Sequence, residues 1–149
     1  MLIDLLQMQQ LAKWMAGKVC AGDVITLSGE VGAGKTTFAQ AFIGALLKTP
    51  ESVTSPTFTL VQAYDTKHAW RVLHADLYRL KHTGELAELG LEEAFESAVS
   101  LIEWPEIATA ILPEHTLDIR LEQAGSDRRN ITFTSASRRW NDIMQEVAA

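Results

Sequence analysis

GEVGAGKT, at residues 29–36, matches the phosphate-binding pattern GxxxxGK[ST]. A short β-rich run, Val24–Ser28, precedes it, and from Lys35 apolar residues recur at helical spacing until Thr49 and Pro50. Strand, glycine loop and helix in this order are the context in which the pattern holds the phosphates of a nucleoside triphosphate. An ordinary glycine turn is the weaker interpretation, because average glycine usage produces this pattern by chance in roughly one such chain in a few hundred. We therefore predict a P-loop.

The residue types of the loop suit an anion. Glycines let successive backbone N–H groups approach phosphate oxygens, and the start of the following helix adds its positive dipole end. Lys35, expected to be exposed, would meet the β and γ phosphates, and the Thr36 hydroxyl would bind Mg²⁺. The loop residues predicted to bind the nucleotide are Glu30, Val31, Gly32, Ala33, Gly34, Lys35, Thr36 and Thr37.

The rest of the chain alternates helical and strand patterns. Helices are expected over 5–19, with Asp4 as N-cap, over 84–95 and over 137–147; strands are expected over 58–64, 70–75 and 98–102 and around 117–121 and 131–133. The strands 58–64 and 70–75 are joined by a short polar turn, which favours an antiparallel pair. The order predicts an α/β fold of the P-loop NTPase type: one domain over 1–149, a mixed sheet with flanking helices, and an antiparallel addition.

Composition limits the setting of the protein. With 149 residues and 47% hydrophobic residues the chain can build one sizeable core, and no apolar run approaches the roughly 18 residues that span a membrane. The N-terminus lacks the pattern of a signal peptide, and one cysteine, Cys20, expected to be buried, fits a reducing compartment. We expect a cytoplasmic protein without a membrane partner. The net charge of −6 argues against a large nucleic-acid surface, so any RNA would be held by a partner protein.

Two carboxylates could serve the metal beside the P-loop. Glu103 follows the apolar run 98–102, which has the form of a buried central strand, and Asp76 follows a less apolar strand that carries His74. We favour Glu103 as the metal-side acid, with Asp76 assisting through water or orienting a nearby loop. Lys35, Asp76 and Glu103 form the predicted catalytic set. His74 itself is interpreted as a packed or hydrogen-bonded histidine.

The segment 54–59, TSPTFT, carries four hydroxyls in six residues. It follows the P-loop helix, where switch I lies in P-loop NTPases, and Ser55 or Thr57 could sense the γ phosphate. A turn in which the hydroxyls only satisfy their own backbone is an equally good interpretation.

Other functions remain open at this level. A small-molecule kinase would share the P-loop, but no arginine-rich lid is visible in a chain of this length. A guanine-nucleotide switch would need an NKxD segment, which the sequence lacks, so ATP is the expected nucleotide. A module that binds ATP without significant turnover is a further alternative.

Five segments together resemble the bacterial TsaE family. They are GEVGAGKTT at 29–37, TSPTFTLV at 54–61, HADLYRL at 74–80, ELGLEEAF at 88–95 and LIEWPE at 101–106. The resemblance implies an ATPase that works with TsaD and TsaB in making the threonylcarbamoyladenosine modification of tRNA. It also implies that Thr36 and Glu103 hold Mg²⁺ and that Ser55, Thr57 and Asp76 act at the nucleotide. The resemblance is weak at the ends of the chain. There one arginine of the pair Arg128 and Arg129 could reach the nucleotide, and we assign this contact to Arg128.

Overall fold

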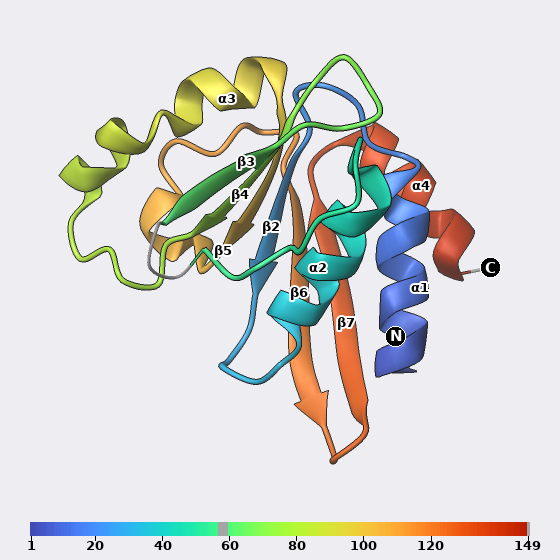
Figure 1. The fold of residues 1–149 in the computed structure, drawn as a ribbon. Helices are drawn as coiled ribbons and strands as arrows, with labels where there is room; N and C mark the ends of the chain where they lie inside the picture. The colour runs from blue at the N-terminus through green and yellow to red at the C-terminus, as the bar shows by residue number, and fades with distance from the viewer. Residues whose placement is uncertain (57–59, 149) are drawn as a thin grey trace.

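The computed structural model describes residues 1–56 and 60–148 and shows a seven-stranded mixed sheet with helices on both faces (Figure 1). The strand order is β1-β7-β6-β2-β5-β4-β3. The strands are β1 (Leu2–Asp4), β2 (Val24–Ser28), β3 (Val61–Tyr64), β4 (Val72–Asp76), β5 (Val99–Glu103), β6 (Leu117–Ala124) and β7 (Arg128–Ser135). The helices are α1 (Leu5–Ala16), α2 (Lys35–Leu46), α3 (Leu91–Ser97) and α4 (Arg138–Ala148), with 3₁₀ segments η1 (Thr83–Leu89) and η2 (Pro105–Ala108).

The centre of the sheet is parallel and its two margins are antiparallel. Strand β2 pairs in parallel with β5 and β6, and β5 with β4, whereas β3–β4, β6–β7 and β1–β7 are antiparallel. The predicted mixed α/β sheet with an antiparallel addition is therefore confirmed. Because the central strands run the same way, their carboxyl ends meet at one edge, where ligands bind in such sheets.

Two apolar layers hold the helices on the sheet. Helices α1, α2 and α4 bury side chains such as Met8, Phe38 and Trp140 against one face. On the other face η1, α3 and η2 bury a second cluster that includes Leu91 and Phe95. The central strand β2 contributes to both clusters and all five of its residues are buried. A strand covered on both faces is typically apolar throughout, and β2 departs from this at Thr26 and Ser28, whose hydroxyls donate to the Asp118 carboxylate.

Helix α1 shows why its start was predictable and its end was not. The Asp4 carboxylate accepts a hydrogen bond from the Gln7 N–H at 2.8 Å, and the Gln7 side chain accepts one from the Asp4 N–H at 2.9 Å, which forms a capping box. The helix ends at Ala16 rather than near residue 19, because Gly17 closes it and donates to Trp14 and Met15.

Other expectations are corrected. The helix expected over 84–95 is divided into η1 and α3 by Gly90, which adopts φ +70°. The edge strand β1 was not predicted. Cys20 is exposed rather than buried. Partial burial of its thiol and the nearby Asp23 carboxylate raise the pKa of Cys20.

In the described part of the chain, no helix has the length and apolarity needed to cross a lipid bilayer.

Candidate nucleotide-binding site

The P-loop connects β2 to α2 and is shaped by its glycines. Gly29 has φ +133°, and a Cβ there would lie 2.1 Å from the carbonyl oxygen of Leu121, so any side chain would force the backbone to move. Gly34 has φ +103° and caps α2, whose first hydrogen bond runs from the Phe38 N–H to the Gly34 carbonyl at 2.9 Å. Both glycines therefore adopt backbone conformations that L side chains rarely take, as the motif predicted.

Lys35 is the first residue of α2 and is buried, with 5% of its surface exposed, which corrects the expectation of an exposed loop lysine. Its ammonium donates to the carbonyl of Gly29, donates to that of Glu30 at 2.9 Å, and lies 3.9 Å from the centre of the Trp104 ring. Burial lowers the pKa of Lys35, and the nearby carboxylates of Glu103, Asp76 and Glu106 oppose this shift. The charge is thus held in place at the base of the loop.

The two candidate acids end neighbouring parallel strands. Asp76 of β4 is directly in register with Glu103 of β5, and the two residues are 5% and 2% exposed. The Asp76 carboxylate accepts a hydrogen bond from the Tyr78 N–H at 3.0 Å. Glu103 ends β5 because Trp104 adopts a left-handed φ of +54°, an uncommon conformation for a large side chain. The backbone therefore places both residues at the edge of the sheet that carries the P-loop.

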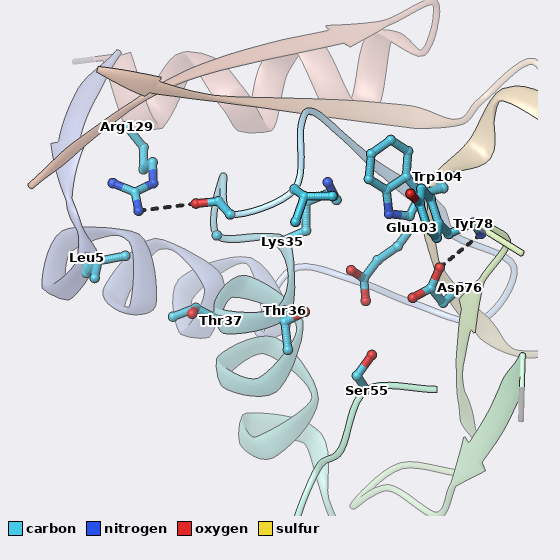
Figure 2. Close-up of a pocket in the computed structure, with 13 residues that line it drawn as sticks. Leu5, Lys35, Thr36, Thr37, Ser55, Asp76, Tyr78, Glu103, Trp104 and Arg129 are labelled. Atoms are coloured by element: carbon cyan, nitrogen blue, oxygen red, sulfur yellow. Dashed lines mark hydrogen bonds between the residues drawn. The ribbon is translucent and has the colours of Figure 1, made fainter. Parts of the chain in front are cut away.

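These groups surround one cavity of about 430 Å³ (Figure 2). In the close-up the carboxylates of Glu103 and Asp76 lie on one side, and the P-loop and Arg129 lie on the other. The lining residues are Leu5, Val31, Gly32, Gly34, Lys35, Thr36, Thr37, Ser55, Asp76, Tyr78, Glu103, Trp104 and Arg129. Two cationic side chains and two carboxylates thus line the same cavity.

Most residues predicted from the sequence to meet the nucleotide line this cavity. Glu30 and Ala33 belong to the same loop but are not among its lining residues. Thr57, like the adjoining part of the predicted switch loop, lies outside the described residues. The roles of all these residues toward a nucleotide stay predictions.

Arg128, which we predicted to contact the nucleotide, does not line the cavity, whereas the neighbouring Arg129 does. Side chains alternate along β7, so Arg128 is exposed whereas Arg129 is buried and lines the cavity. Its guanidinium donates to the carbonyl of Ala33 at 3.0 Å and to that of Gly32 at 3.4 Å. The buried Arg129 of β7 therefore holds the P-loop backbone through these two hydrogen bonds.

Sequence reasoning also missed the aromatic wall of the site. The rings of Tyr78 and Trp104 are tilted against each other with centroids 4.8 Å apart, and both line the cavity. Leu5, at the start of α1, closes another part of the wall.

The residues that line the cavity could hold Mg²⁺ only if phosphate oxygens and water supplied the rest of its ligands. Among the described residues no group of three His, Cys, Asp or Glu side chains is arranged to hold a metal ion. Mg²⁺ typically takes one or two protein ligands and completes its octahedron with phosphate oxygens and water. Thr36 and Glu103, which both line the cavity, fit such a partial set.

A buried parallel strand, a glycine loop closed by Lys35 and Thr36, and an acid at the end of the adjacent strand define a P-loop NTPase-like fold. The family model described as "Threonylcarbamoyl adenosine biosynthesis protein TsaE" matches residues 3–131. The chain therefore belongs to the TsaE family, which confirms the resemblance inferred from its five motifs.

Individual relatives agree. The tRNA threonylcarbamoyladenosine biosynthesis protein TsaE of Bacillus subtilis (strain 168) is 39% identical over 139 residues, which cover 93% of this chain and 85% of that protein. The protein of the same name from Rickettsia bellii (strain RML369-C) is 39% identical over 124 residues, covering 83% and 85%. The crystal structure of Bacillus subtilis YdiB superposes with a TM-score of 0.78 and 32% identity, over 98% of this chain and 90% of that one.

Proposed function

We propose that this protein binds Mg-ATP in the 430 Å³ cavity, hydrolyses it slowly alone, and supports threonylcarbamoyladenosine modification of tRNA together with TsaD and TsaB. One observation carries the nucleotide part: buried Lys35 and the in-register acids Asp76 and Glu103 converge on the P-loop. The family membership and the printed names of the relatives support the role in tRNA modification.

In this proposal each group has a defined task. Backbone N–H groups of the loop and the Lys35 ammonium bind the phosphates. Thr36 and Glu103 would hold Mg²⁺, which would supply positive charge beside the transferred phosphoryl group. Asp76 orients a water molecule or the loop around Ser55. Arg129 keeps the P-loop backbone in place through the Gly32 and Ala33 carbonyls.

Slow turnover by the isolated protein follows from the charges that the site holds. Lys35 is fixed at the phosphate end, and Arg129 is engaged by loop carbonyls. A cation supplied in trans to a P-loop NTPase is worth about 10³ to 10⁵ in rate, and we assign that supply to the partner proteins. The net charge of −6 favours an indirect contact with tRNA through the same partners.

The test is steady-state ATP hydrolysis with and without the TsaD–TsaB pair. We expect weak basal activity, stimulation by the pair, and loss of both in Lys35→Ala. Ser55→Ala should bind ATP but lose stimulation, whereas Ser126→Ala, which removes an exposed hydroxyl in the β6–β7 turn, should respond like the wild type. Turnover by folded Lys35→Ala at the wild-type rate would refute the site. Equal activity with and without the pair would refute the coupling.

A further inference from the structure

His74 lies in the middle of β4 and is completely buried. Its Nε2 is 2.6 Å from Oε2 of Glu103, and the two side chains are 0% and 3% exposed. A buried contact this short between a histidine and a candidate metal-side acid has no part in the function proposed above. His74 does not line the cavity, so it can reach a ligand only through Glu103.

The strand register explains how the contact forms. Residues two apart on a strand share a face, so His74 points to the same side of the sheet as Asp76, whose register partner is Glu103. The Glu103 side chain on β5 therefore contacts His74, which lies two residues before Asp76 on the neighbouring strand β4. A carboxylate that binds a metal ion must be ionised and then only accepts hydrogen bonds, so in that state Nε2 of His74 would be the donor. The buried Nδ1 has no partner among the described residues.

We propose that His74 is a positioning residue, which holds the Glu103 carboxylate by one oxygen and leaves Oε1 to bind Mg²⁺. This inference rests on the proposed binding of Mg-ATP. Carboxylate ligands of metals are themselves held by hydrogen bonds, and removing such an outer partner typically lowers metal affinity 10- to 100-fold. A free Glu103 side chain would have to lose its rotational freedom on binding the ion, whereas a hydrogen-bonded one has already lost it.

The competing explanation is that the pair only fills and stabilises the core. A buried histidine–carboxylate pair removed at one partner destabilises a protein regardless of any ligand. The two explanations differ in what a substitute must keep. A structural role depends on volume and general polarity, whereas a positioning role depends on a donor at the place of Nε2.

Two amide variants separate these roles. Glutamine in His74→Gln carries an N–H donor the same number of bonds from Cα as the histidine Nε2, whereas asparagine in His74→Asn is one bond shorter and cannot reach Glu103. The measurement is calorimetric titration of Mg²⁺ into protein saturated with ADP, at a temperature below the melting transition of every variant. ADP affinity without metal is measured beside it as a control for the P-loop.

We expect wild type and His74→Gln to bind Mg²⁺ within about threefold of each other and His74→Asn to bind it 10- to 100-fold more weakly. Metal-free ADP affinity should be unchanged. If His74→Asn does not fold, His74→Leu, which removes the donor at similar volume, takes its place. Equal Mg²⁺ affinity in the donor-keeping and donor-free variants, whether high or low, would overturn the positioning role. A wild type without Mg²⁺-dependent binding would instead overturn the proposed function.

Discussion

Gly29 offers the sharpest test of the P-loop geometry. In Gly29→Ala the new Cβ would lie 2.1 Å from the carbonyl oxygen of Leu121, a backbone atom of β6 that cannot rotate away. The residue also has φ +133°, which costs a non-glycine residue about 1–3 kcal/mol. Relieving the overlap by moving backbone adds about 1–3 kcal/mol. We expect the free energy of unfolding to fall by roughly 2–6 kcal/mol, a large share of the 5–15 kcal/mol typical of a domain.

Two other glycines separate the cost of the positive φ from the cost of the steric overlap. Gly32 has φ +83° but no atom within 4 Å of its virtual Cβ, so Gly32→Ala should pay only the backbone cost, about 1–2 kcal/mol. Gly44 is exposed within α2 and has no neighbour that an added Cβ would meet. Gly44→Ala should therefore raise the stability by about 1 kcal/mol through helix propensity.

The assay is urea unfolding followed by circular dichroism, with comparable slopes for all variants as the condition for comparing midpoints. Because the Gly29 carbonyl accepts a hydrogen bond from Lys35, ATP affinity should fall in Gly29→Ala and stay near the wild type in Gly44→Ala. If Gly29→Ala were as stable as Gly32→Ala, the contact with β6 would be relieved without cost and the steric reasoning would be wrong.

Three further predictions concern other features. Glu103→Gln should weaken the Mg²⁺ dependence of ATP binding more than Asp76→Asn does, and the reverse order in a metal titration would make Asp76 the metal-side acid. Arg139→Gln removes two hydrogen bonds, of 2.6 and 2.9 Å, to the buried Asp23, and should lower the free energy of unfolding by about 1–3 kcal/mol. The control Arg138→Gln changes a side chain that is 95% exposed, and should alter that free energy by less than about 0.5 kcal/mol. Because the pKa of Cys20 is raised, less thiolate exists at any given pH, so the exposed thiol should react with a disulfide reagent more slowly than free cysteine at pH 8, and equal rates would contradict the shift.

The parts of the site that depend on local chemistry could be predicted from the sequence. The P-loop needs particular residue types at fixed spacing, so Gly29, Lys35 and Thr36 were identifiable without any structure. Asp76 and Glu103 were identifiable as strand-end acids. Their alignment in register was not, because it depends on the strand order, which places β4 directly beside β5.

Other features were missed for separate physical reasons. The alternation at Ile131 and Phe133, extended two residues back, places Arg129 on the inner face, so the sequence did contain the signal that distinguishes it from Arg128. Strand β1 has three residues and is stabilised by pairing with β7, so it shows no period of its own. The position of Trp104 follows from its left-handed backbone conformation. Large residues rarely adopt that conformation, so the sequence does not indicate it.

The cavity is lined by side chains of both charges, and the nucleotide that we propose for it would meet both. Lys35 and Arg129 are its positive groups, and Asp76 and Glu103 are its negative groups; all four side chains are buried. A bare triphosphate would gain from the first pair and be repelled by the second, because like charges in a partly buried site are weakly screened. A divalent cation between the phosphates and the acids reverses the sign of that second interaction. The same carboxylates act on Lys35: burial lowers its pKa, and the nearby negative charges partly oppose this shift. We therefore expect the acids to make nucleotide binding selective for the magnesium complex over the free nucleotide.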